Sequence, residues 1–239
     1  MVKMTWYILG VLIILVVGSY FMSRTLPGLE KIDNTMHQAV IQKGSDNEEI
    51  EKNYKGVEYQ ITPLYTYEIS GLIVSLNDNN IWYSRFKNID PLNTKDFCLI
   101  WGGNLKNVNY LNADFKTEEF VCFAEFTGGS LDVDEISNNH LLPANDKVYR
   151  IIRRAGIGDQ VRISGYLANY SAKSSKGEVT RDTSIVRSDT GNGACETVYV
   201  ENIEIINNQN QIWRVINLVS KYLITLCVLL LIFLPAEYG

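Results

Sequence analysis

The stretch GDQVRISGYLANY, residues 158–170, decides the fold. Val161, Ile163 and Leu167 alternate with polar residues, and an apolar period of two predicts a strand with one buried face. Gly165 shares this face with them, and the leading Gly-Asp pair turns the chain into the strand. We therefore expect Ile163 to point into the interior of a β domain.

A helix is predicted directly before this strand. Asn145 or Asp146 can cap its first turn, and Gly156 can end it in the left-handed conformation. Apolar residues recur with helical spacing at Val148, Ile151, Ile152 and Ala155. The opposite face carries Lys147, Arg150, Arg153 and Arg154, the usual composition of a solvated face.

Four further segments are rich in β-branched and aromatic residues, as strands are. They are residues 65–76, 96–101, 119–126 and 196–206. Residues 137–145, SNNHLLPAN, are predicted to form a loop before the helix. The expected order is therefore three strands, one helix and two strands.

This order resembles that of the OB-fold, a five-stranded Greek-key barrel. Residues 158–165, GDQVRISG, are similar to the GDxVxVxG opening of strand four in many OB domains, and Gly71 is similar to the glycine in the middle of their first strand. Glycine permits the sharp bends that close a small barrel. The resemblance covers residues 59–206, with extra length in 77–95 and 104–117, and implies a mainly β, OB-fold-like barrel with one capping helix.

Two apolar stretches, residues 6–22 and 215–234, approach the ~20 residues that cross a bilayer as a helix. Lys221 lies early enough in the second to reach the headgroups, and Trp213 and Arg214 precede it as interface anchors do. We predict an integral membrane protein with two spans. As a whole, the chain is similar to membrane-anchored bacterial proteins, a likeness that implies no activity.

Each stretch has an alternative interpretation. Lys3 and the small residues around Gly18 allow a cleaved signal peptide, although signal cores have only about 7–15 apolar residues. The second stretch can instead be a buried amphipathic helix, although residues 222–234 carry no charge on any side.

The polar segment between the first span and the barrel lacks sustained periodicity and contains an acidic run at residues 46–51. It is therefore predicted to be a tether. The predicted organisation is a tail 1–5, span 6–22, tether 23–56, OB-like domain 57–206, juxtamembrane segment 207–214, span 215–234 and tail 235–239.

The charge bias near the spans mildly favours a cytoplasmic domain, with Arg24, Lys31 and Arg214 on the domain side and Lys3 in the tail. Long domains translocate largely regardless of charge, however, and an early span after a basic start is typical of a signal anchor. We therefore predict an extracytoplasmic, periplasmic domain.

Three of the four cysteines, Cys98, Cys122 and Cys195, lie outside the predicted spans, and Cys227 lies inside one. If the second and third predicted strands form a hairpin, Cys98 and Cys122 lie opposite each other and can form a disulfide, which leaves Cys195 as a thiol. A Cys122–Cys195 bond and three buried thiols remain alternatives. The absence of a CxxC pair or His-Cys cluster predicts no metal site, and no cofactor is predicted.

The segment RDTSIVRSDTGNGACETVYV, residues 181–200, leads into the last predicted strand. In OB-folds this loop borders the ligand-binding face. The resemblance therefore implies that Arg181, Arg187 and Asp189 lie at the rim of a binding groove. The alternative, which we expect, is that Arg187 pairs with Asp189 to order the loop.

Candidates for catalysis are few. His140 can act as a general base partnered by Asp132, Asp134 or Glu135, or it can cap a turn. Asp189 is the second catalytic candidate. No GxSxG, Walker, HExxH or dinucleotide-binding glycine pattern is present.

OB-folds that bind single-stranded nucleic acid combine positive charge with stacking aromatic residues. Tyr67, Trp82 and Trp101 are the candidate aromatic residues, but the formal net charge of −5 argues against this ligand. We predict a membrane-anchored OB-like binding or assembly module for a protein or glycan partner. The alternatives are single-stranded nucleic-acid binding and a membrane-anchored hydrolase or nuclease that uses four rim residues, His140, Arg181, Arg187 and Asp189.

Overall fold

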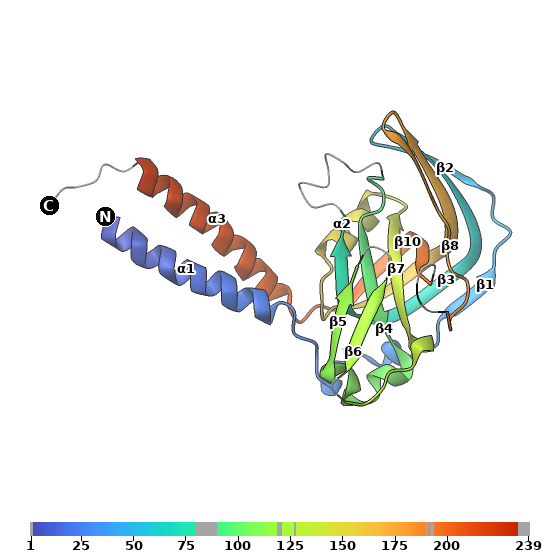
Figure 1. The fold of residues 1–239 in the computed structure, drawn as a ribbon, viewed down its shortest axis with the longest axis horizontal. Helices are drawn as coiled ribbons and strands as arrows, with labels where there is room; N and C mark the ends of the chain where they lie inside the picture. The colour runs from blue at the N-terminus through green and yellow to red at the C-terminus, as the bar shows by residue number, and fades with distance from the viewer. Residues whose placement is uncertain are drawn as a thin grey trace. The chain divides into compact units, whose positions relative to one another are not determined.

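The computed structural model describes residues 2–79, 90–118, 121–126, 128–189, 191 and 194–233. It divides into two compact units. One unit, Met1–Thr25 with Gln209–Gly239, is helical, and the other, Leu26–Asn208, is mainly β (Figure 1).

The helical unit contains α1, Val2–Met22, and α3, Gln211–Phe233. Both helices are long and apolar enough to cross a membrane, which agrees with the two predicted spans. Within this unit the side-chain amide of Asn217 donates hydrogen bonds to the Val16 carbonyl oxygen at 2.8 Å and to Ser19 Oγ at 3.0 Å.

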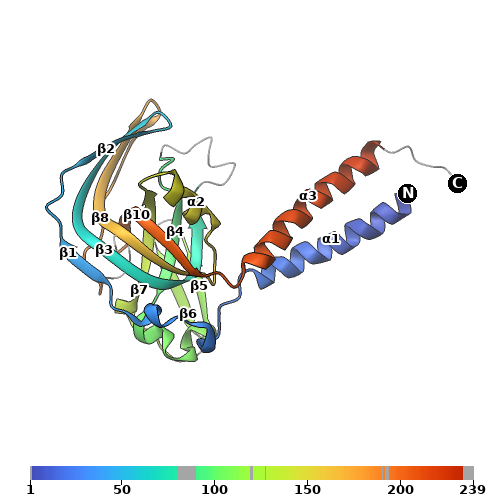
Figure 2. The same ribbon diagram turned by 180° about the vertical axis from the view of Figure 1, so that it is seen from behind.

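Five strands of the β unit pair in a closed sequence. These strands are β3 (Val57–Asp78), β4 (Lys95–Ile100), β7 (Ile136–Pro143), β10 (Glu196–Asn207) and β8 (Gln160–Ser174). Each pairs with the next, and β8 pairs with β3 again, so we call them the strand ring (Figure 2). The β7–β10 pair is parallel and the other four pairs are antiparallel.

Three shorter strands extend the ring along β3 and β8. Strands β1 (Ile41–Gly44) and β2 (Ile50–Tyr54) pair with β3, and β9 (Gly177–Arg181) pairs with β8. Residues 23–56, predicted to be a tether, therefore belong largely to the β unit. A two-residue turn with positive φ at Lys55 and Gly56 joins β2 to β3, the geometry that tight hairpins favour.

The third strand of the ring lies elsewhere than predicted. In segment 119–126, residues 119 and 120 lie outside the described residues. Residues 122–126 form β6 (Cys122–Phe126), which pairs with β5 (Ala113–Thr117) in a separate two-stranded sheet. The third ring strand is β7, in the segment predicted to be a loop. All residues of β7 except the first are buried. Its polar residues are therefore buried too, and they do not alternate with apolar residues in the way that predicts a strand.

Helix α2, Asp146–Arg154, begins where predicted, and the side chain of Asn145 accepts hydrogen bonds from the backbone of Lys147 and Val148. The prediction for Gly156 is wrong, because the helix ends at Ala155 in an extended conformation. Gly158 has the positive φ, 84°, and turns the chain towards β8. Short 3-10 helices occupy Leu29–Lys31, Asn34–His37, Gly102–Leu105, Val108–Asn112 and Val133–Glu135.

The main core is formed by buried side chains of the strand ring and of α2. Ile163 is fully buried there with Val161 and Leu167, which confirms the predicted inward face of β8. A Cβ at Gly165 would overlap the carbonyl oxygen of Tyr199 on β10, so close strand pairing requires glycine at this position.

Candidate functional site

The candidate site lies on the face of β4 and β7 that points away from the main core. Phe97 and Leu99 belong to that core, so Cys98 between them points to the opposite side of β4. Cys98 is paired with Asn138 of β7, and directly paired residues share a face of the sheet. We call the surface that carries Cys98 and Asn138 the outer face.

A cavity of about 240 Å³ lies on the outer face. Its apolar lining comes from β6 and the segment before β7, namely Val121, Ala124, Phe126, Leu131, Val133 and Ile136. Its remaining lining is Cys122, Ser137, Asn138, Asp189, Gly191, Ala194 and Cys195. We call this cavity the outer groove. One wall thus comes from the loop before β10 that the sequence had singled out.

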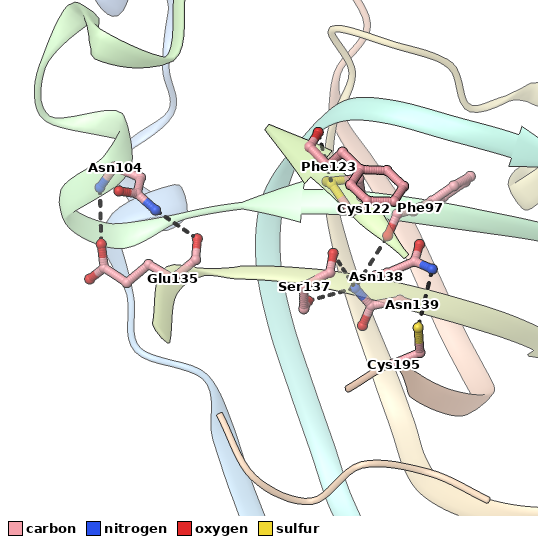
Figure 3. The surroundings of a disulfide bond; sticks show 10 residues. Phe97, Asn104, Cys122, Phe123, Glu135, Ser137, Asn138, Asn139 and Cys195 are labelled. Atoms are coloured by element: carbon pink, nitrogen blue, oxygen red, sulfur yellow. Dashed lines mark hydrogen bonds between the residues drawn. A yellow bond between two sulfur atoms is a disulfide. The ribbon is translucent and has the colours of Figure 1, made fainter. Parts of the chain in front are cut away.

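A disulfide bond joins Cys98 to Cys122, with 5.7 Å between the two Cα atoms. This is the predicted pair, but the predicted reason is wrong. The two cysteines lie in different sheets, Cys98 in the ring and Cys122 in the β5–β6 hairpin. The bond therefore fixes the hairpin, and with it one wall of the outer groove, to β4 (Figure 3).

Asn138 and Cys195 meet in the groove. The Asn138 side-chain nitrogen donates to Cys195 Sγ at 3.4 Å, and its oxygen faces away from Cys195 (Figure 3). That oxygen, Asn138 Oδ1, is buried without a hydrogen-bond partner in the described part of the chain. Burial raises the pKa of Cys195 to about 11, so this thiol is protonated at neutral pH and is a poor nucleophile.

Arg187 pairs with a different carboxylate from the one predicted. It forms an ion pair with Glu196, whereas Asp189 accepts a hydrogen bond from Ser184 Oγ at 2.5 Å. Burial raises the pKa of Glu196 to about 7, against the opposing effect of Arg187. Arg187 also lies over the ring of Tyr67, 5.7 Å from its centroid. The partner of Arg187 is therefore Glu196 and not Asp189, and a structural role for Arg187 stays a prediction.

The aromatic residues predicted to bind a ligand are not on the outer face. Tyr67 and Trp101 are 2% and 3% exposed and belong to the main core. The Tyr67 hydroxyl donates to Asn139 Oδ1 at 3.2 Å. Trp82 lies outside the described residues.

His140 lies in β7, not in a loop, and neither of its predicted roles is observed. Its Nδ1 is 2.6 Å from Asp96 Oδ1, and the two side chains are 1% and 0% exposed. Asp132 instead accepts from the backbone of Asp134, and Glu135 from that of Asn104. The buried His140–Asp96 pair joins β7 to β4.

The four rim residues predicted from the sequence do not all line the outer groove. Asp189 lines the outer groove, whereas His140, Arg181 and Arg187 are not among its described lining residues. Arg181 ends β9, opposite Tyr170 of β8. Asn138 lines the groove as well, although its sequence context did not predict this. Its only signal was its position two residues before His140 in an unusually polar segment.

A second cavity, of about 490 Å³, lies over β2, β3, β8 and β9. Its lining is mostly polar and charged: Glu51, Glu58, Tyr59, Gln60, Ser171, Lys173 and Glu178. Within the described ranges, no group of three or more His, Cys, Asp or Glu side chains is placed to hold a metal ion. Of these two cavities, the outer groove is the one whose lining combines mostly apolar residues with a few polar ones, the usual composition of a binding site.

Comparison with protein-family models, with curated proteins and with solved structures finds no match to this chain.

Proposed function

We propose that this chain is a membrane-anchored binding module whose outer groove receives part of a protein partner. The observation that carries the proposal is the exposure of apolar side chains in the groove. Phe126 and Val133 line it and are 40% and 52% exposed. Contiguous exposed apolar surface on a folded domain is typical of a site of protein association.

We propose further that the strand ring is an OB-fold barrel. Three observations support this assignment: the closed pairing order, the parallel β7–β10 pair, and the position of α2 between β7 and β8. Strands β4 and β7 would then be OB strands two and three, whose outer surface is the usual ligand-binding face. The outer groove lies on that surface.

The two apolar helices and the disulfide support an extracytoplasmic, periplasmic location for the β unit. Disulfides persist in oxidising compartments and are rare in the cytosol, and the Cys98–Cys122 bond ties together two parts of the β unit. Because α1 and α3 flank this unit in the sequence, two spans would leave all of it on one side of the membrane.

The other ligand classes have less support. The glycan and nucleic-acid sites considered from the sequence relied on Tyr67 and Trp101, which are buried in the main core. A hydrolase or nuclease based on His140 needs that side chain to reach a substrate, whereas His140 is 1% exposed and bonded to Asp96.

Site-specific photo-crosslinking in native membranes tests the proposal. A photoreactive amino acid at Val133, in the groove, is compared with one at Val108, which is 50% exposed and lies outside the groove lining. We expect a discrete crosslinked protein from position 133 and none from position 108. Equal products from both positions, or none from position 133, would contradict a groove-specific partner.

A further inference from the structure

Lys221 is a charged residue on an exposed side of α3, within the segment proposed to cross the membrane. It was expected near the start of a span that began at residue 215, whereas α3 begins at Gln211 and ends at Phe233. Lys221 is therefore ten residues from the first residue of the helix and twelve from the last. Lysines near helix ends reach the headgroups with their long side chains, but Lys221 is near neither end.

The packing of α3 against α1 gives the depth of Lys221 independently. Asn210 donates to the Thr25 carbonyl oxygen at 2.7 Å, and Asn217 donates to residues 16 and 19. The two helices are therefore antiparallel, and Lys221, one turn beyond Asn217, lies level with about residue 14 of α1. This level is the middle of the apolar segment Met4–Met22. At 1.5 Å per residue, it is roughly 13 Å from either end of that segment.

Lys221 lies outside the seam between the two helices. The buried residues of the pair recur every seven positions, as in coiled-coil packing. They are Thr5, Leu12 and Ser19 in α1, and Ser220 and Cys227 in α3. Neither α1 nor α3 contains an aspartate or a glutamate, so the two helices provide no carboxylate for the Lys221 ammonium group.

Two more polar side chains share the exposed side with Lys221. Thr225 follows Lys221 by four residues and Tyr222 by three, so the three lie on one side of the helix. Tyr222 is 69% exposed, and Thr225 is exposed as well. We call Lys221, Tyr222 and Thr225 the polar face. Lipid chains offer these groups no hydrogen-bond partner, so a polar face at this depth is costly unless another protein covers it.

The charge of the polar face selects what covers it. An ammonium group inside a membrane is stabilised by pairing with a carboxylate. The phosphate groups of lipids lie at the membrane surface, beyond the hydrocarbon layer. A second copy of this chain has no carboxylate in either helix. The source that fits is a transmembrane helix of a different protein, with an aspartate or glutamate near its middle.

We infer that the polar face binds a transmembrane helix of another membrane protein, and that an aspartate or glutamate of this helix pairs with Lys221 inside the membrane. This inference rests on the proposed anchoring by two spans. It assigns a second contact surface, in a different unit of the chain from the outer groove.

Photo-crosslinking in native membranes tests the inference. A photoreactive amino acid is placed at Leu218, which is 54% exposed and one turn before the polar face, or at Leu223, which is 42% exposed on another side of α3. We expect a crosslinked membrane protein with an acidic residue in a transmembrane helix from position 218, and no such product from position 223. The product should persist in Lys221→Arg and be lost in Lys221→Met. Lys106→Met, at an exposed lysine of the β unit, should not change it.

A designed helix tests the charge pairing without the natural partner. Labelled Leu-Ala helices of about 20 residues carry Glu, Gln or Leu at the middle, and their association with the full chain in phosphatidylcholine vesicles is measured by energy transfer. We expect the Glu helix to associate about tenfold more tightly than the Leu helix, the order of one polar contact between membrane helices. Lys221→Glu should instead prefer a helix with a central lysine.

Equal association of the Glu and Leu helices would overturn the inference. So would a crosslinked product that persists in Lys221→Met, or one whose transmembrane helices lack acidic residues. Extraction with alkaline carbonate tests the anchoring separately, because a chain that is extracted does not span the membrane. A retained chain that fails the Leu218 and Glu-helix tests rejects only the inference. Crosslinking at Val133 still decides the function proposed for the outer groove.

Discussion

Arg187 and Glu196 form an ion pair that ties the loop before β10 to the first residue of that strand. Glu196 is 2% exposed, so its charge depends on this partner. Cys195, the residue before Glu196, lines the outer groove. The pair therefore holds one wall of the groove in place.

At pH 8, where Glu196 is ionised, Arg187→Ala should destabilise the β unit by up to about 3–5 kcal/mol, because it leaves a buried carboxylate without its cation. The loop should also loosen and expose Cys195. Melting temperature and alkylation of Cys195 in the folded, detergent-solubilised protein measure the two effects. Lys116→Ala is the control, because Lys116 and Glu118 form an exposed pair with side chains 72% and 53% accessible and such pairs contribute little. An unchanged melting temperature with Cys195 still protected would contradict a structural role for Arg187.

The titration of Glu196 should make stability depend on pH. Its pKa is raised from 4.5 to about 7 by burial, so between these values the folded state keeps a proton that the unfolded state has lost. Stability should therefore fall as pH rises from about 4.5 to 7, by up to about 3 kcal/mol from this group. The free energy of unfolding, measured in urea from pH 4.5 to 8, should fall less steeply for Glu196→Gln than for the wild-type protein. Parallel profiles for the two proteins would show that Glu196 does not titrate in this range.

Ile163→Asp should cost at least about 4 kcal/mol, because it places an unpaired carboxylate in the main core. Ile163 is fully buried there. Ile185→Asp is the matched control, since Ile185 is 41% exposed and surface changes usually stay within about 0.5 kcal/mol. Denaturant unfolding compares the two variants. If Ile163→Asp unfolds at the same denaturant concentration as the control, the inward face of β8 is wrong.

Thiol counting tests the disulfide. The chain has four cysteines, and one bond between Cys98 and Cys122 leaves thiols at Cys195 and Cys227. Mass spectrometry of denatured, unreduced protein should therefore find two alkylated cysteines, and four after reduction. Cys227→Ser should lower each number by one. Four alkylated cysteines without reduction would exclude the disulfide in that preparation.

The disulfide should matter most for the β5–β6 hairpin, because this hairpin forms its own two-stranded sheet and such a hairpin is marginally stable alone. Closing a loop between cysteines 24 positions apart stabilises a fold by about 3 kcal/mol in the chain-entropy account. In a Cys98→Ser, Cys122→Ser protein, hydrogen exchange should accelerate across residues 113–126. Exchange in β8 should stay slow. Equal acceleration in β8 would show that the bond stabilises the whole β unit.

Regular alternation made much of the strand ring predictable from the sequence. In β8, Val161, Ile163 and Leu167 point inward between polar residues, and the period of two is visible in the sequence alone. The start of α2 was equally clear, because Asn145 provides a side-chain cap before a periodic apolar face. In both elements local pattern and tertiary burial agree.

Strand β7 was not predictable in this way, because its stability depends on partners far away in the sequence. Asn139 and His140 are buried polar residues that resemble loop residues until Tyr67 and Asp96 are placed beside them. Segment 122–126 has strand composition, but composition does not reveal that β5 is its partner. The groove was missed for the same reason, since its walls meet only after β6, β7 and the loop before β10 are assembled.

The position of β10 has a consequence for biosynthesis. It is the last strand of the β unit in chain order, yet it lies between β7 and β8. Only Asn208, Gln209 and Asn210 separate its end from α3. The ring cannot close until β10 has left the ribosome, and by then α3 follows directly behind it in the chain. The β unit therefore completes its sheet only after its other strands have been made, and the edges of β7 and β8 that pair with β10 stay unpaired until then.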